Sequence, residues 1–231
     1  MIKTKWFEVS TQERINVIAD ALSTHRFRRG ASTGVELISV SDRQIEGKFI
    51  EELHNTEIYV DPFGDEIRNE VRRFSIFAFV IFRVRKGHYL LRITAGPRNL
   101  RSFVQFLSDA IGFGLAVSPI VVDVAAFLKM LKVAKGFQLV RVKKIRAGQI
   151  RLAGRSVARV EITSAADAFD DLTQTIELGD AILEKASVDF HLDGLVRNVE
   201  LTATGSLTTD LSLLPVITPM FIKCFGRDDE L

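Results

Sequence analysis

A long run of β-branched and aromatic residues at positions 66–84 constrains the fold of this chain more than any other segment. It is too long and too rich in these residue types for an ordinary surface helix. Its second half, residues 74–82, is continuously apolar, as is typical of a strand in the centre of a sheet. That stretch is far shorter than the roughly 20 residues that cross a bilayer. We therefore expect a sheet-based, soluble protein of the cytoplasm that does not bind a membrane.

The segments before this run add two strands and one helix. Residues 35–40 and 44–60 have the alternation of strands, and the sequence Asp61-Pro62-Phe63-Gly64-Asp65 is a strong turn signal. Ser10 and Glu13 have the spacing of a capping box, with apolar residues following at helical intervals. The pattern predicts a first helix over 11–24.

The middle of the chain predicts a compact β-α-β unit. Residues 88–94 form the first strand, 100–111 the helix and 115–122 the second strand. Asp123 is placed to cap a further short helix with an apolar inner face. Residues 137–162 then read as a hairpin that turns at Ala147-Gly148.

The final third repeats the pattern of helix and strands. A helix opens near Asp167, a hairpin with Asp193-Gly194 at its turn covers 188–204, and a helix over 213–225 closes the chain. We expect an α+β fold of two related strand–helix–strand lobes with mainly antiparallel sheets. The predicted regions are an N-terminal helix and hairpin region (1–84), a basic lobe (85–162) and an acidic C-terminal lobe (163–231).

The net charge hides a strong segregation along the chain. Lys and Arg number 31 and Asp and Glu 29, which gives +2 overall. Residues 71–108 contain no acid and carry +8, and residues 124–160 contain no acid and carry +10. Residues 161–231 carry −10. Long basic stretches without acids are typical of proteins that bind a polyanion, and we rank nucleic acid ahead of an internal acidic partner.

The second basic stretch supplies the predicted DNA-binding residues. Its lysines at the short helix recur every three residues and would share one flank, and its remaining bases lie on the predicted hairpin. The set is Lys129, Lys132, Lys135, Arg141, Lys143, Lys144, Arg146, Arg151, Arg155 and Arg159. A solvated helix face is the alternative explanation for the three lysines of the helix.

No catalytic motif stands out. The chain has no phosphate-binding loop of the Gly-x-x-x-x-Gly-Lys type, and its four histidines lack the spacing of a metal site. Its only cysteine, Cys224, excludes an internal disulfide. The acids Asp61, Asp65 and Glu66 cluster in a turn, where turn formation explains them better than cation binding. We expect no enzyme activity, no metal and no cofactor.

Several short segments together resemble a known family. They are 87–93, 117–122 and the run Ala134-Lys135-Gly136-Phe137-Gln138-Leu139-Val140, followed by 188–193 and the turn Gly205-Ser206-Leu207. This set resembles the RdgC family of recombination-associated proteins. In that family a strand, a helix and a second strand lead to a Gly-Phe-Gln-Leu segment. The similarity extends over about residues 85–210, and the first 84 residues match poorly.

This resemblance implies a DNA-binding protein of bacterial chromosomes. The family forms a ring-shaped dimer around duplex DNA without sequence preference and restrains RecA-driven strand exchange. The phage exclusion protein RexA is similar to the family and adds phage defence as a second setting. The resulting expectation is a sequence-nonspecific double-stranded-DNA-binding protein that acts as a homodimer or higher oligomer. The alternative is a protein–protein interaction subunit of an antiphage defence system that makes no direct contact with DNA.

Overall fold

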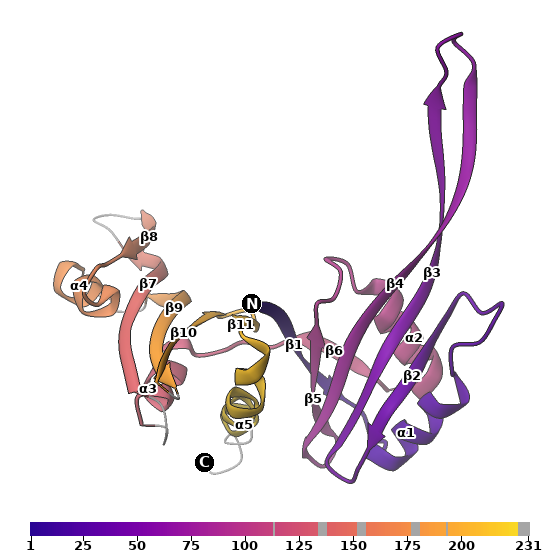
Figure 1. The fold of residues 1–231 in the computed structure, drawn as a ribbon. Helices are drawn as coiled ribbons and strands as arrows, with labels where there is room; N and C mark the ends of the chain where they lie inside the picture. The colour runs from indigo at the N-terminus through magenta and orange to yellow at the C-terminus, as the bar shows by residue number, and fades with distance from the viewer. Residues whose placement is uncertain (113, 134–137, 152–155, 177–180, 193, 226–231) are drawn as a thin grey trace. The chain divides into compact units, whose positions relative to one another are not determined.

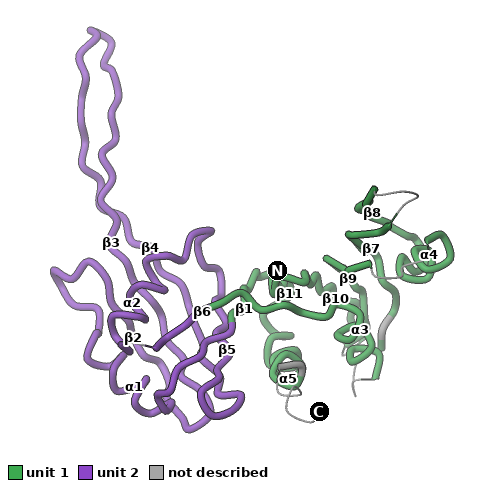
Figure 2. Tube along the Cα trace, turned by 180° about the vertical axis from the view of Figure 1, so that it is seen from behind, with its two compact units in different colours: residues 1–7, 118–231 green, residues 8–117 purple. Residues whose placement is uncertain are grey.

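The computed structural model describes residues 1–112, 114–133, 138–151, 156–176, 181–192 and 194–225. Within this described part, eleven strands and five α-helices alternate along the chain (Figure 1). The expectation of an α+β protein built on antiparallel strands is confirmed. The chain divides into two compact units, one of residues 8–117 and the other of residues 1–7 with 118–231 (Figure 2). The charge-based regions above describe composition, whereas these two units are defined by packing.

The strands are β1 (Ile2–Ser10), β2 (Thr33–Val40), β3 (Gln44–Val60), β4 (Glu66–Arg85), β5 (His88–Thr94), β6 (Ala116–Pro119), β7 (Gln138–Arg151), β8 (Val157–Thr163), β9 (Ile182–Leu192), β10 (Leu195–Thr202) and β11 (Ser206–Thr209). The helices are α1 (Ile15–Thr24), α2 (Arg101–Ile111), α3 (Val124–Val133), α4 (Ala168–Thr175) and α5 (Leu214–Phe225), with a 3-10 turn, η1 (Leu211–Leu213), before α5. The strand order is β2-β3-β4-β5-β1-β11-β10-β9-β7-β8, and β6 pairs with β1. Every helix in the described part falls short of the length and apolar character that a membrane span requires.

An aromatic cluster forms the core of the unit of residues 8–117. Phe49 on β3 and Phe77 on β4 lie with ring centroids 5.4 Å apart, and Phe103 of α2 contacts both. Phe49 and Phe77 are directly opposite each other in the β3–β4 register, so their side chains lie on the same face of the sheet. The contacts of Phe103 place helix α2 on that face. The other apolar residues of α2 recur at helical spacing, so they lie on the same side of the helix as Phe103.

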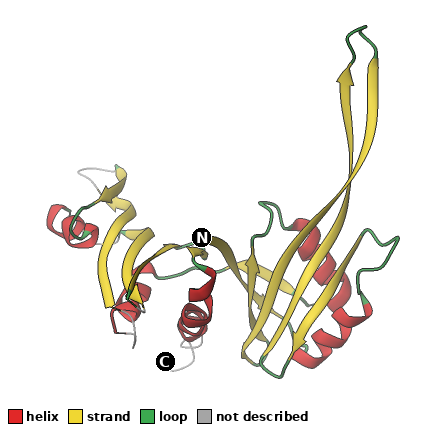
Figure 3. Ribbon diagram, in the orientation of Figure 1, coloured by secondary structure: helices red, strands yellow, loops and turns green. Residues whose placement is uncertain are grey.

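The second unit has its own core on one face of β1, β11, β10, β9 and β7. Trp6 of β1 stacks on Phe221 of α5 at a centroid distance of 4.6 Å, and Phe221 also contacts Phe127 of α3 at 5.1 Å. These three rings place α3 and α5 on the same side of the strands (Figure 3). Because side chains alternate along a strand, Lys5 next to Trp6 lies on the opposite face.

Strands β3 and β4 extend beyond the neighbouring strands as a two-stranded arm, which we define as residues 53–73 (Figure 1). Asp61 forms the predicted turn at its tip, with its Oδ1 accepting from the amides of Phe63 at 2.8 Å and Asp65 at 2.9 Å. This bonding is the Asx-type turn expected from the sequence, and it uses Asp61 structurally.

The N-terminal prediction is wrong in one respect. Residues 2–10 form strand β1, and α1 begins at Ile15 instead of residue 11. Ser10 is the last residue of the strand. Thr11, and not Ser10, accepts a hydrogen bond from the amide of Glu13, at 3.3 Å from its Oγ1. Alternation of buried Thr4 and Trp6 with Lys3 and Lys5 is the strand signal that the capping-box pattern obscured.

The predicted turn at Ala147-Gly148 is also wrong. Strand β7 continues through these residues to Arg151 and pairs with β8 on one side and β9 on the other. The register shifts between Ala147 and Ile150, and Gln149 has a positive φ of 58°. A bulge therefore replaces the expected turn, because one extra residue inserted into a strand can bend it without ending the pairing. The second predicted strand of the β-α-β unit is shorter than expected, since β6 covers only four residues.

Candidate nucleic-acid interface

The face of the second unit opposite α3 and α5 is polar across six strands. Directly paired residues of an antiparallel sheet share a face, so consecutive pairings define continuous rows of side chains. One row contains Lys3, Thr208, Glu200, Ser187, Lys144 and Thr163, on β1, β11, β10, β9, β7 and β8. With strands about 4.8 Å apart, this row spans about 24 Å.

A second row runs beside the first. It contains Lys5, Ser206, Thr202, Lys185, Arg146 and Glu161. In this row, Ser206 of β11 and Thr202 of β10 are joined by a hydrogen bond, in which the Ser206 amide donates to Thr202 Oγ1 at 3.0 Å. We call the two rows, together with the side chains that bond across them, the polar sheet face.

Ion pairs connect neighbouring strands across this face. Glu161 of β8 accepts from Lys144 Nζ and from Arg146, whose Nε lies 2.8 Å away. Lys185 of β9 pairs with Glu200 of β10 at 2.8 Å. Two further pairs join Arg141 to Asp189 at 3.2 Å and Arg159 to Glu184 at 2.8 Å.

These pairs change the electrostatics of the basic segment. The hydrogen bonds from Lys144 and Arg146 lower the pKa of the Glu161 carboxyl below its ordinary value, so Glu161 is ionised at neutral pH. The bases are Lys3, Lys5, Arg141, Lys144, Arg146, Arg159 and Lys185, and the acids are Glu161, Glu184, Asp189 and Glu200. Seven bases against four acids leave the polar sheet face with a net charge of +3.

Four of the predicted DNA-binding residues lie together on this face: Arg141, Lys144, Arg146 and Arg159. Lys143 is exposed at a register shift of β7, and Arg151 is exposed at the end of the same strand. The β7–β8 ribbon therefore gathers most of the predicted hairpin bases, although acids of β8 and β9 accompany four of them.

The predicted helix lysines lie elsewhere. Lys129 and Lys132 are exposed on α3, whose Phe127 packs toward Phe221 on the apolar side of the strands. The structure therefore does not bring them to the same face as Lys144 and Arg146. Lys135 and Arg155 fall outside the described residues.

Three bases of the polar sheet face were missed from the sequence: Lys3, Lys5 and Lys185. Lys3 and Lys5 come from the far N-terminus, and Lys185 from the acidic third of the chain. The alternation of Lys3 and Lys5 with Thr4 and Trp6 was the signal that could have identified a strand with a basic face. The pairing of β1 with β11, which brings them to this sheet, had no sequence signal.

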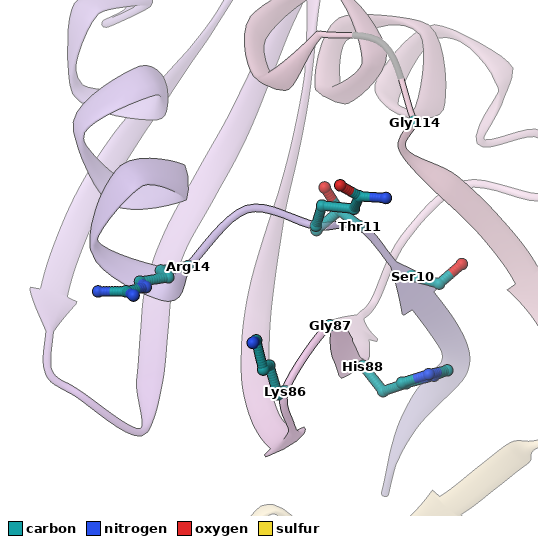
Figure 4. A pocket seen from close by; sticks show the side chains of 8 residues that line it. Ser10, Thr11, Arg14, Lys86, Gly87, His88 and Gly114 are labelled. Carbon is teal, nitrogen blue, oxygen red and sulfur yellow. The ribbon is translucent and has the colours of Figure 1, made fainter.

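A separate pocket of about 670 Å³ lies in the unit of residues 8–117, between the β1–α1 connection and the β4–β5 turn (Figure 4). It is lined by Ser10, Thr11, Gln12, Arg14, Lys86, Gly87, His88 and Gly114. The amide of Thr11 donates to the carbonyl of Gly87 at 3.0 Å and holds the two turns together.

The lining has basic and polar groups and no carboxylate, which favours an anion over a cation. Figure 4 shows Arg14 and His88 extending to opposite sides of the Lys86-Gly87 turn, so the basic groups do not converge on one point. His88 Nδ1 lies 3.1 Å from Glu8 Oε1, and this contact orients the imidazole toward β1.

Among the described residues, no group of three or more His, Cys, Asp or Glu side chains is arranged to hold a metal ion. The turn acids Asp61 and Asp65 belong to this described part of the chain.

Comparisons with known proteins do not identify a family. No family model matches the chain. No curated protein matches it. Among solved structures, the chain is similar to the di-domain ARO/CYC StfQ from the steffimycin biosynthetic pathway, with 12% identity over 96% of this chain and 92% of that chain. The TM-score of 0.24 is too low for this likeness to inform the fold or the function.

Proposed function

We propose that this chain is a sequence-nonspecific double-stranded-DNA-binding protein that contacts phosphates through its polar sheet face. The observation that carries the proposal is the pair of rows that gather bases from β1, β7 and β9 on a face without a covering helix from α3 or α5. Its net charge of +3 counts four acids already present on the face.

Phosphate oxygens would compete with the carboxylates for the same donors. The Lys and Arg side chains of this face are long and partly exposed, with 35% of the Lys144 side chain and 38% of the Arg146 side chain accessible. They can turn toward a phosphate while Glu161 stays in the row. Each phosphate that is neutralised releases condensed counterions, so about four to six contacts give a slope of log K against log salt of about −4 to −5.

Duplex is favoured over single-stranded DNA by the composition of the rows. Neither row contains an aromatic side chain on which an unpaired base could stack. Ser, Thr and Lys side chains on a broad sheet suit contacts to sugar and phosphate, which position a protein without reading sequence.

The biological setting that we propose, recombination control or phage exclusion without enzyme activity, rests on the resemblance to the RdgC family. The two related lobes, expected from the repeated strand–helix–strand pattern, and the homodimer or higher oligomer belong to the same proposal. No cofactor or metal takes part in it.

A mobility-shift titration tests the proposal. Two duplexes of unrelated sequence are titrated at low salt, with a single strand of the same length as a competitor. We expect the two duplexes to bind equally and the single strand to compete weakly. Absence of a shift at low salt overturns the proposal, and a clear preference for one duplex overturns its sequence-nonspecific form.

One observation favours the alternative, a protein–protein interaction subunit with no direct contact with DNA. Four bases of the β7–β8 ribbon already have acidic partners from residues 161–231 of the same chain. In this alternative, the segregated charges serve internal pairing and docking on other proteins. The absorbance ratio at 260 and 280 nm of the purified protein separates the two functions, since a DNA-binding protein retains nucleic acid at low salt.

A further inference from the structure

The arm of residues 53–73 has no buried side chain, although it contains 21 residues. Apolar groups are exposed along it, including Tyr59 at 52%, Ile58 at 58% and Phe63 at 90%. A two-stranded ribbon on its own is marginally stable in water. The arm therefore has the composition of a surface that another molecule covers.

The arm also has two free strand edges. Strand β5 pairs with β4 only from Ala78 onward, so residues 66–77 of β4 have no described strand on that side. Strand β2 pairs with β3 only up to Glu51, so residues 53–60 of β3 are free in the same sense. An exposed edge of this length is a template for pairing with a strand of another chain.

The charges along the β4 edge are self-complementary. Between Glu66 and Arg72, acids and bases alternate at every second residue, in the order Glu66, Arg68, Glu70, Arg72. All four lie on one face of the ribbon, because side chains alternate along a strand. When this series is reversed about Asn69, a base stands wherever the original series has an acid, and an acid stands wherever it has a base.

We propose that two copies of this chain associate through β4, antiparallel and across a two-fold axis at Asn69. Arg68 then lies opposite Glu70 of the second copy, and Glu66 lies opposite Arg72 of the second copy. The two-fold axis repeats each contact, so four opposite-charge pairs form on one face.

On the other face of the same interface, the β4 edge carries two apolar residues, Ile67 and Val71, on either side of Asn69. Ile67 lies opposite Val71 of the second copy, and the axis repeats this contact. Within the arm, Tyr59 of β3 is opposite Ile67 on this face, whereas Val71 is opposite Asn55 and Asn69 is opposite Glu57. Asn69 faces its own equivalent, where its amide can both donate and accept.

Neighbouring registers are excluded by charge. A two-fold axis perpendicular to the ribbon places one residue opposite itself, so each register is named by its central residue. Centring on Arg68 sets Arg68 against itself and Glu66 against Glu70, and centring on Glu70 sets Glu70 against itself and Arg68 against Arg72. Like charges directly opposite destabilise a strand pair.

The β3 edge carries no comparable pattern. Its only charged side chain between residues 53 and 60, His54 aside, is Glu57, which has no base on the same edge to lie opposite in a second copy. Self-pairing through β3 would therefore have no charge to set its register. This contrast assigns the second copy to β4 and provides a matched control.

A cysteine crosslink tests the central residue of the register. In antiparallel pairs, opposite Cα atoms lie about 4.5–5.5 Å apart, within the range that a disulfide bridges. With the native Cys224 replaced by Ser, we expect Asn69→Cys to form a covalent dimer under mild oxidation. The matched variant Asn55→Cys, on the β3 edge, stays monomeric on a denaturing gel. No crosslink in Asn69→Cys, or equal crosslinking in both variants, overturns the proposal.

Charge exchange tests the pairing chemistry by sedimentation equilibrium. Arg68→Glu or Glu70→Arg alone converts two attractive pairs into two repulsive pairs and raises the dimer dissociation constant about tenfold or more. The double variant restores opposite charges and brings the constant back to within about threefold of wild type. Circular dichroism confirms that each variant is folded. A monomeric wild type at all concentrations, a single variant without effect, or a double variant as weak as the singles overturns the proposal.

The inference is independent of DNA binding. It uses only residues of the arm, whereas the proposed phosphate contacts use the polar sheet face of the other unit. All sedimentation measurements are made on nucleic-acid-free protein, so loss of dimerisation and loss of DNA binding are distinguishable.

Discussion

The β7–β8 ribbon and the arm are both long antiparallel ribbons, and they differ in what each of their faces contacts. On β7, Val142 and Ile145 are buried on one face, while Lys144 and Arg146 are partly exposed on the other. On the arm, neither face buries a side chain. A ribbon with one buried face is stabilised by its own unit, whereas the arm is held only through the parts of β3 and β4 that pair with β2 and β5.

The same two ribbons show how charge along a chain differs from charge in a sheet. Residues 124–160 contain ten bases and no acid, yet β7 lies between β8 and β9, whose acids pair with it. The arm falls partly within the other acid-free stretch, yet five acids and three bases leave residues 53–73 with a net charge of −2. The order of the strands in the sheet determines which surface is basic more than the distance between charged residues along the sequence does.

The largest expected effect separates the two ribbons by stability. Ile145 is fully buried on β7, and Ile58 is 58% exposed on the arm. Ile145→Ala removes buried methyl groups and leaves a cavity, so we expect a loss of about 2–5 kcal/mol in the free energy of unfolding. Ile58→Ala is expected to cost less than about 0.5 kcal/mol. Urea denaturation followed by fluorescence or circular dichroism compares the pair, and equal costs would contradict the description of the arm.

The next effect concerns DNA affinity. Changing Lys3, Lys144 and Lys185 to Glu turns the net charge of the polar sheet face from +3 to −3. We expect duplex affinity at low salt to fall about hundredfold or more, because phosphate contacts supply most of nonspecific binding.

The matched control for this variant reverses Lys129 and Lys132 on α3, which are exposed on the other side of the strands. These two residues belong to the interface predicted from the sequence, but not to the polar sheet face. Fluorescence anisotropy with a labelled duplex measures both variants. An equal or larger loss in the α3 variant would move the interface to the helix.

Much of the secondary structure was predictable, because it depends on local patterns. The bounds of β3 and β5 match the expected strands, Asp123 caps α3 as predicted, and α4 begins next to Asp167, where a helix was expected. The composition of the polar sheet face was not predictable. It depends on the pairing of β1 with β11, about 200 residues apart in the chain, and on a bulge in place of a turn. Neither feature leaves a periodic signal in the sequence.

A smaller effect is expected from neutralising Glu161. The change Glu161→Gln removes the carboxylate that accepts from both Lys144 and Arg146, and leaves these bases available to phosphates. The net charge of the face rises by one, so we expect duplex affinity to increase about threefold at low salt. Isothermal titration calorimetry measures the change. Unchanged or weaker binding would indicate that Lys144 and Arg146 do not contact DNA.

The smallest effect is the pH dependence of that same group. Because the pKa of Glu161 is lowered in the folded protein, its ion pairs stabilise the fold above the pKa of the unfolded carboxyl. This stabilisation is lost as the pH falls through the lowered pKa. The melting temperature of wild type should therefore exceed that of Glu161→Gln by a small, constant margin from neutral pH down to about pH 5, and the margin should vanish in strong acid. A margin that grows in acid would contradict the assigned ion pairs.

The salt dependence of duplex binding tests the central claim most directly. Anisotropy titrations of wild type and of the Lys3, Lys144 and Lys185 variant are repeated at several salt concentrations. The proposed phosphate contacts predict a slope of log K against log salt of about −4 to −5 for wild type, reduced in magnitude by about three in the variant. A wild-type slope near zero, or the same slope in both proteins, would contradict phosphate binding by the polar sheet face.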